Sequence, residues 1–206
     1  MAPSHSKITP KIKLHIWGSS HVTDLHYLPE SFQELDADPR YESPIWHGRS
    51  GGKINQDTIN RIMSAMNTSY NNAERQVHII FLGSNNLRDE FEGWTPEEVR
   101  DYFEMVCCHA GSLSNVHIVI CGILPSPINM DESMNRFAPC SSLLKELATR
   151  FRPITSYINI PDHFNSFGEV KWYFYNGRQI HLTKSGAEKL AKLFQNHLKF
   201  HPEKFF

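Results

Sequence analysis

Short apolar runs alternate along the chain with longer amphipathic segments. Five runs are short and rich in β-branched or aromatic residues, which is typical of strands. The predicted strands cover residues 11–17, 45–46, 77–82, 116–121 and 156–160. Four segments carry apolar residues at helical spacing, in residues 54–66, from Pro96 onward, and in residues 141–151 and 187–200. Thr95 and Glu98 have the spacing of a capping box, so the second helix is predicted to begin at Pro96.

The order of these elements predicts an α/β fold. Strands that alternate with helices through short connections form a parallel sheet that helices cover on both faces. The length of 206 residues suits one domain with a substantial core. We therefore expect residues 1–10 to be a disordered lead and residues 11–206 to form a single domain. In such folds the chemistry lies beyond the carboxyl ends of the strands.

Composition narrows the classes of function. Lys and Arg number 21 and Asp and Glu 22, a formal net charge of -1, so the chain lacks the strong positive field of a dedicated duplex-DNA binder. No apolar run reaches the roughly 18 residues that span a bilayer, and the first residues lack the apolar stretch of a secretory signal. The four cysteines have no C-x-x-C spacing. We therefore expect reduced, mostly buried thiols in a cytoplasmic protein.

Small and polar residues follow the predicted strands, where an active site would lie. They are Ser20, the glycine pair Gly51-Gly52, Asn85 and, before the last helix, His181. A serine hydroxyl becomes a nucleophile when a base takes its proton, and a histidine does so near neutral pH. The oxyanion of the tetrahedral intermediate then needs hydrogen-bond donors. The candidate donors are the Ser20 N–H, the N–H of Gly51 in preference to Gly52, and the Asn85 side chain.

The order Ser20, Gly51, Asn85, His181 resembles the sequence blocks of the SGNH (GDSL-type) hydrolases. The blocks read IWGSSHVTDL, RSGGKI, IIFLGSNNLRD and IHLTKSG, and the resemblance extends over most of the chain. It implies a flavodoxin-like three-layer α/β/α sandwich of about five parallel strands. It also implies a serine ester hydrolase with Ser20 as nucleophile, His181 as base, and Ser20, Gly51 and Asn85 around the oxyanion. The substrates implied are small-molecule, glycan or lipid esters, and the reaction requires no cofactor.

Two positions depart from that family pattern. Ser19 stands where the Gly-Asp-Ser block of the family has its aspartate. This middle residue of the block is not the nucleophile, so the change is modest. Arg178 stands three residues before His181, where the family has the aspartate that orients the histidine. A cation there would disfavour a charged imidazole. Two arrangements are open: a backbone carbonyl holds the ring N–H of His181 in a Ser–His dyad, or Arg178 faces solvent while a distant carboxylate such as Asp162 approaches.

A non-catalytic binding module is the alternative hypothesis. The segment from Lys171 to the C-terminus holds seven Lys and Arg against two Glu. In this interpretation Arg178, Lys184 and Lys189 contact the phosphates of RNA or another anionic partner. The chain would then be similar in kind to SGNH-like domains without a full catalytic set, such as the RNA-binding domain of Oskar and the esterase-like domains of LINE retrotransposons.

Three further features are candidates for the walls of the site. His21 follows the candidate nucleophile and is expected to line the pocket. The loop of residues 125–139 is a candidate lid over the site. The aromatic residues 172–175 precede the histidine loop and form either a hydrophobic wall or edge strand, or one side of a substrate pocket.

Overall fold

The computed structural model of the chain describes residues 11–26, 38–68, 74–88, 93–128, 131, 133–166, 169–176 and 181–200. The predicted lead of residues 1–10 lies outside the described residues, as does Arg178. The expectations for both therefore stay predictions.

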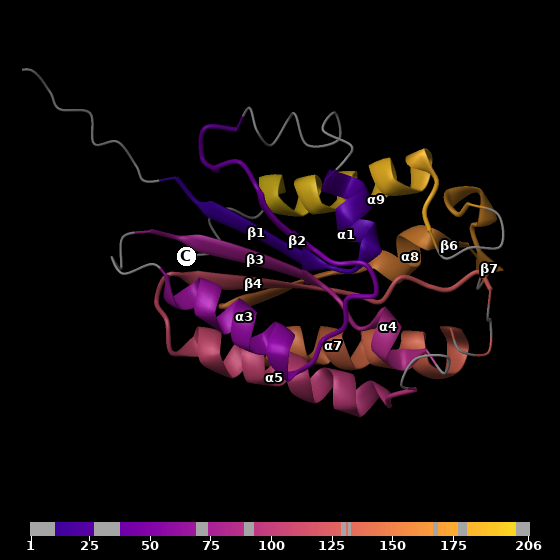
Figure 1. Cartoon of the computed structure of the whole chain (residues 1–206), viewed down its shortest axis with the longest axis horizontal. Coiled ribbons are helices and arrows are strands. Elements are labelled where there is room, and N and C mark those ends of the chain that lie inside the picture. Colours follow the sequence, from indigo (N-terminus) through magenta and orange to yellow (C-terminus); the bar gives the residue numbers. More distant parts are fainter. Residues whose placement is uncertain are drawn as a thin grey trace, which may run out of the picture.

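A five-stranded parallel sheet forms the centre of the molecule, with the strand order β2-β1-β3-β4-β5 (Figure 1). The strands are β1 (Lys13–Gly18), β2 (Ile45–Gly48), β3 (Gln76–Phe81), β4 (Val116–Cys121) and β5 (Thr155–Ile158). All four pairings are parallel, so the carboxyl ends of the strands meet at one edge of the sheet. Each strand corresponds to one of the strands predicted from the sequence.

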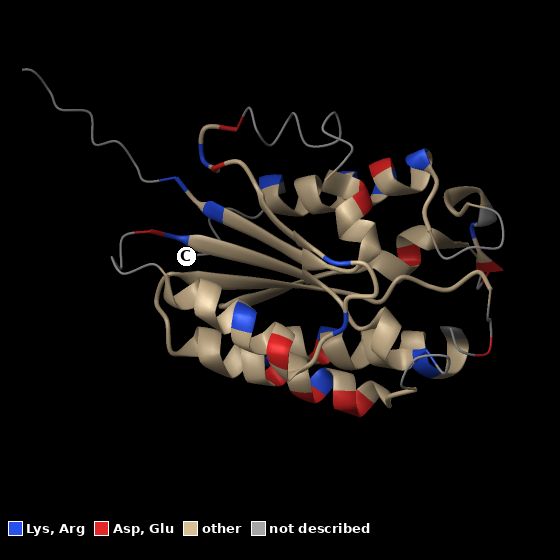
Figure 2. Ribbon diagram, viewed as in Figure 1, with Lys and Arg blue, Asp and Glu red and all other residues tan. Residues whose placement is uncertain are grey.

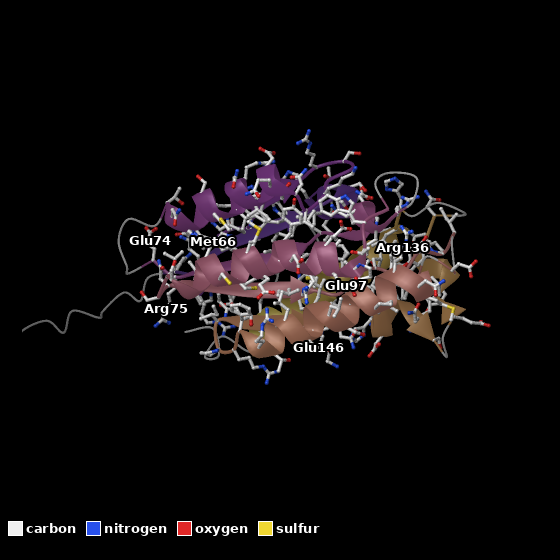
Figure 3. All side chains as sticks on the ribbon, turned by 90° about the horizontal axis from the view of Figure 1, so that it is seen from below. Met66, Glu74, Arg75, Glu97, Arg136 and Glu146 are labelled. Carbon is white, nitrogen blue, oxygen red and sulfur yellow. The ribbon has the colours of Figure 1, made fainter. Side chains whose placement is uncertain are left out.

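Helices cover both faces of this sheet and complete three layers. One face carries α1 (Ser20–His26), α8 (Ile160–Phe164) and α9 (Lys184–Phe200), and the other carries α3 (Gln56–Asn67), α5 (Pro96–Gly111) and α7 (Ala138–Arg150) (Figure 1). Seen from the second face, α3, α5 and α7 lie side by side (Figure 3). The short helix α4 (Ser84–Leu87) follows β3. The predicted α/β/α sandwich is confirmed.

The strands divide their side chains between two cores, because successive residues of a strand point to opposite faces. Leu14 and Ile16 pack toward α1 and α9, whereas Trp17 packs toward α3 and α5. The inner strands β3 and β4 are buried along their whole length, as expected for a parallel sheet covered on both faces. Among the described residues, Lys, Arg, Asp and Glu lie on helices and loops, apart from Lys13 at the start of β1 and Glu169 of the short strand β7 (Figure 2).

Local capping signals account for where two of the helices begin. The Thr95 hydroxyl accepts a hydrogen bond from the Glu98 N–H, and the Glu98 carboxylate accepts one from the Thr95 N–H at 2.8 Å. This is the predicted capping box of α5. The Asn55 side chain accepts from the Thr58 N–H at 3.0 Å, so α3 begins at Gln56 rather than at residue 54.

Two segments differ from the sequence-based expectation. The segment predicted as a loop over residues 125–139 is helical from Ser133, because a π-helical turn at Ser133–Phe137 leads directly into α7. The aromatic segment forms a 3-10 turn at Trp172–Phe174 rather than an edge strand. The two-residue strands β6 (Asn165–Ser166) and β7 (Glu169–Val170), like α4 and α8, are too short for a periodic pattern and were not predicted.

Four stacked rings lie on the α3 face of the sheet. Between ring centroids, His15 of β1 is 4.5 Å from His78 of β3, and Trp17 of β1 is 3.6 Å from His47 of β2. The Trp17 indole N–H donates to Nδ1 of His78 at 3.1 Å, and Nε2 of His78 contacts the Gln76 side-chain oxygen at 2.9 Å. Burial lowers the pKa of His15 and of His47 to about 4, and that of His78 well below its usual value. These imidazoles are therefore neutral at physiological pH.

Three of the four free thiols are buried, as expected, but Cys108 is exposed. Burial raises the pKa of Cys107 and of Cys140 to about 12, so neither thiol is a nucleophile near neutral pH. None of the described helices is long and apolar enough to cross a membrane.

Candidate active site

Ser20, the candidate nucleophile, begins α1 directly after β1. The Ser19 carbonyl accepts from the N–H groups of Val22 and Thr23 at 3.1 and 3.3 Å, so Ser19 precedes the first helical residue. The turn needs glycine at position 18, because a Cβ there would lie 2.1 Å from a Val22 methyl carbon. The Ser20 N–H is one of the first-turn amides that have no partner within their own helix. It is therefore available to a ligand at the carboxyl edge of the sheet.

Asn85 reaches the same edge from α4, after β3. The chain leaves the neighbouring strands β1 and β3 toward opposite sides of the sheet, which is the switch point where such folds bind ligands. The buried Asn85 amide donates to the Gly52 carbonyl at 3.1 Å, and this bond uses one of its two N–H groups. The neighbouring Asn86 is structural, since it exchanges two hydrogen bonds with the Ile54 backbone at 2.9 and 2.7 Å.

The backbone around His181 is held by the aromatic segment that precedes it. The His181 carbonyl accepts from the Asn176 N–H at 2.8 Å. Tyr175 and Leu182 form an antiparallel bridge, and the buried Tyr175 hydroxyl donates to the Pro125 carbonyl at 2.7 Å. Tyr175 is thus part of the frame that positions the candidate base.

The His181 ring lies over the first turn of α1. Its Nδ1 is 3.7 Å from a carboxylate oxygen of Asp24, and its ring centroid is 6.1 Å from that of His21. Asp24 follows Ser20 by one helical turn, so the two share a helix face. The His181 ring therefore contacts the helix that begins with the candidate nucleophile, at a residue one helical turn beyond Ser20. None of the hydrogen bonds among the described residues joins the Ser20 hydroxyl to the His181 ring. About half of the His181 and Asp24 side chains is exposed (47% and 45%), so a substrate can reach them.

Asp24 was not identified from the sequence. One of the two arrangements left open by the sequence placed a carboxylate from a distant part of the chain beside His181. Asp24 is such a carboxylate, but the sequence analysis had suggested Asp162. The Asp162 carboxylate accepts from the Asn159 side chain at 2.5 Å, on α8. The spacing of four residues between Ser20 and Asp24 was the available signal, because it places both on one face of α1.

His21 lines a small cavity beside Asn85, as expected. The cavity has a volume of about 20 Å³ and is lined by His21, Ser84, Asn85, Arg88, Leu124, Pro125, Ser126 and Phe137. The first residues of the predicted lid thus border the site. Only 6% of His21 is exposed, and none of the described groups bonds its Nδ1. Burial, with a smaller contribution from the charge of His181, lowers the pKa of His21 to about 4.

The two glycines of the second block differ in their surroundings. Gly51 is exposed at φ 67°, in a turn that the Gly52 N–H closes by donating to the Arg49 carbonyl at 2.8 Å. A Cβ on Gly51 would meet nothing within 4 Å. A Cβ on Gly52 would lie 3.2 Å from Cα of Ser19 and 3.1 Å from the Gly18 carbonyl oxygen. The structure therefore packs Gly52, rather than the favoured Gly51, against the serine turn.

The lysines predicted to bind anions, Lys184 and Lys189, do not line the hollow in which other cations gather. Lys184 lies 3.9 Å from Glu188 in the next turn of α9, and Lys189 is partly buried on the same helix. A hollow of about 290 Å³ lies instead beside the glycine turn. It is lined by Trp17, Gly18, His47, Arg49, Ser50, Gly51, Gly52, Lys53, Asn55, Thr58, Arg61 and Leu82. Of the described residues that line this hollow, three are cations and none carries a carboxylate.

Solved structures define the class of fold. The chain is similar to a member of the lipolytic G-D-S-L family from Veillonella parvula, with 12% identity and a TM-score of 0.73 over 92% of this chain and 99% of that one. A GDSL-like lipase from Bacteroides thetaiotaomicron gives 13% identity and a TM-score of 0.68 over 97% and 92%. The acetyl xylan esterase AlAXEase gives 17% and 0.68 over 90% and 99%.

The protein therefore has the fold of the GDSL-type (SGNH) lipases and acylhydrolases, as the sequence blocks implied. No family model matches the sequence, and no curated protein matches it significantly.

Proposed function

We propose that the protein is a serine ester hydrolase of the SGNH type. One observation carries the proposal: the His181 imidazole lies against Asp24, one helical turn from Ser20, at the switch point of the sheet. A candidate nucleophile on the same helix as the carboxylate that contacts a candidate base, at such an edge, is an arrangement that supports acyl transfer.

Ser20 and His181 carry the two proton transfers of the reaction. The Ser20 oxygen attacks the ester carbonyl carbon while His181 takes the hydroxyl proton. The tetrahedral intermediate collapses, the alcohol leaves with the proton from His181, and the acyl group stays on Ser20. A water molecule then attacks this acyl-enzyme, His181 takes a proton from it, and the acid is released as Ser20 regains its hydrogen.

Two donors are assigned to the oxyanion, the Ser20 N–H and the second N–H of the Asn85 side chain. Each such donor contributes on the order of 3–4 kcal/mol to the stability of the transition state. The predicted donation by the Gly51 N–H stays a prediction. We assign Gly52 a steric role, because only a residue without a side chain allows the glycine turn to approach Ser19 so closely.

Asp24 is assigned the role that the family gives to the missing aspartate. A carboxylate beside Nδ1 favours the tautomer whose Nε2 has a free lone pair for the serine proton. It also stabilises the imidazolium that forms once His181 has taken this proton. Asp24 acts through His181 and is therefore a positioning residue.

The small cavity favours esters of short acyl groups. We assign the cavity beside Asn85 to the acyl group. Its volume of about 20 Å³ is of the order of the space that one water molecule needs, which suits a short acyl group better than a long chain. We expect p-nitrophenyl acetate to be hydrolysed with a higher kcat/KM than p-nitrophenyl octanoate. A preference for the octanoate in steady-state assays would contradict this assignment.

Labelling with a fluorophosphonate tests the proposed nucleophile before any natural substrate is known. The wild type should be labelled, Ser20→Ala should not, and His181→Ala should react far more slowly. Ser43→Ala changes an exposed serine and is the matched control. If the folded wild type is neither labelled nor able to hydrolyse p-nitrophenyl acetate, the proposal fails.

Binding of an anionic partner is the second candidate function, favoured by the cationic hollow. Arg49, Lys53 and Arg61 are better placed for it than the predicted lysines of α9, since they share one concave surface. In filter binding at low salt, Arg61→Gln should weaken the retention of RNA more than Lys184→Gln. No retention of RNA by the wild type would remove this function.

A further inference from the structure

The side chains around His181 form a cluster with one member, His21, that the proposed hydrolysis does not require. One potential ligand atom from each of His21, Asp24 and His181 lies within 4.8 Å of the other two. Two imidazoles and one carboxylate are a ligand set that zinc prefers. His21 also takes no part in the proposed hydrolysis, although its ring is buried and its Nδ1 lacks a partner among the described residues.

The geometry of the cluster is close to that of a bound zinc ion. With ligands at about 2.0–2.1 Å from the metal, tetrahedral coordination sets neighbouring ligand atoms about 3.4 Å apart. The His181 and Asp24 atoms are already 3.7 Å apart. His21 and Asp24 are three residues apart on α1 and so share a helix face. His21 is held by its burial, whereas Asp24 and His181 are half-exposed and can rotate, so side-chain rotation is enough to close the site.

We propose that His21, Asp24 and His181 bind one Zn²⁺ ion, and that this ion inhibits the hydrolase. A metal on Nδ1 of His181 leaves the ring proton on Nε2, which can then only donate a hydrogen bond. A metal on Nε2 occupies the lone pair that would take the Ser20 proton. In both cases His181 cannot act as the base. The inhibition rests on the proposed function, whereas the binding of zinc does not.

Zinc binding is tested without reference to catalysis. Untagged protein is titrated with ZnCl₂ by calorimetry, and its thermal midpoint is measured with zinc and with EDTA. We expect one strong site per chain, a higher midpoint with zinc, and no such effect of Mg²⁺, which prefers oxygen ligands. Asp24→Asn and His21→Gln should each weaken binding by at least about tenfold. His163→Gln replaces an exposed histidine of α8 and should bind zinc like the wild type.

Equal zinc affinity in the wild type, Asp24→Asn and His21→Gln would overturn the site. Asp24 is half-exposed, so Asp24→Asn should fold and keeps the test decisive even if His21→Gln does not fold.

The inhibition is tested separately, by the ratio of p-nitrophenyl acetate hydrolysis in zinc to that in EDTA for each variant. We expect a strong decrease for the wild type and His163→Gln and a weaker one for His21→Gln. Zinc bound at the site without a decrease in the wild type would overturn the inhibition. If neither condition gives hydrolysis, the proposed function fails while the calorimetric result stands.

Discussion

At the scale of single residues, the central feature is the carboxylate that lies beside the candidate base. The position three residues before His181 holds Arg178, yet a carboxylate lies 3.7 Å from the His181 ring. Asp24 supplies it from the helix that begins with the candidate nucleophile. A triad of this kind is defined by geometry and roles rather than by sequence position. One short helix would then carry both the nucleophile and the carboxylate.

Replacing Asp24 tests this assignment. Asp24→Asn keeps the shape of the side chain but removes its charge, so the imidazolium loses its stabilising partner. We expect kcat for p-nitrophenyl acetate to fall by roughly 10²–10⁴-fold, as in serine hydrolases that lose the orienting acid. The assay is run in EDTA, and Asp162→Asn is the control. Equal loss in the two variants, or loss in neither, would argue against the role of Asp24.

At the scale of elements, close approach of the backbone shapes the site. α1 begins against the end of β1, and the glycine turn of residues 49–52 packs on the same end. Asn85 and Asn86 bind this turn and the residues after it to α4. The serine turn, the glycine turn and α4 are therefore one hydrogen-bonded unit, and a change in one of them should displace the others.

Alanine at the two glycines should have different effects. In Gly52→Ala the new Cβ would lie 2.8 Å from the Arg49 carbonyl oxygen and close to Ser19, so backbone has to move. We expect a loss of stability of about 1–3 kcal/mol and at least a tenfold loss of kcat. In Gly51→Ala the new Cβ has open space, so only the positive φ of this residue is unfavourable. We expect a loss of stability of about 1–2 kcal/mol and a smaller loss of kcat than in Gly52→Ala. Urea unfolding and steady-state assays measure both. A larger loss of kcat in Gly51→Ala would restore Gly51 as the important glycine.

At the scale of the whole molecule, buried neutral histidines make the fold sensitive to acid. His78 lies in the ring stack of the sheet, and His117 of β4 contacts Ser156 of β5 at 2.9 Å. Burial lowers the pKa of His117 to about 3 and that of His78 well below its usual value. The two side chains lie on β3 and β4, in the middle of the sheet, so protonation of either would be felt across the fold.

Stability should fall as the pH drops below 6.5. An unfolded histidine has a pKa near 6.5, whereas that of folded His117 is about 3, so between these pH values the unfolded chain binds a proton that the folded protein excludes. The stabilisation is complete above pH 6.5 and declines below it, by up to about 1.4 kcal/mol per pH unit for each such histidine. Urea midpoints at pH 7.5 and 5.0 measure the decline, which should be shallower in His117→Gln. Equal midpoints at the two pH values would contradict this account.

Most of the framework could be predicted from local patterns. β4 was predicted at its observed bounds, and the start of α5 followed from Thr95, Pro96 and Glu98. These features depend on residues adjacent in sequence: a continuous β-branched run, or a cap three residues from its partner. The helical part of the predicted lid was missed, since Ser133–Phe137 is a single turn whose two apolar residues, Met134 and Phe137, are too few to establish a period.

In the candidate site, too, the features that could be predicted are those set by residues close in sequence. Ser20, Asn85 and His181 were predicted because each lies at the end or start of an element that local periodicity reveals. The pairing of His181 with Asp24, the packing of Gly52 against Ser19 and the burial of His21 were not. They arise from the order of the strands and the approach of the segment before α9 to α1, which are contacts between distant residues. Periodicity reflects only residues that are close in sequence, so the sequence could place the candidate nucleophile and the candidate base on their elements but not the groups that surround them.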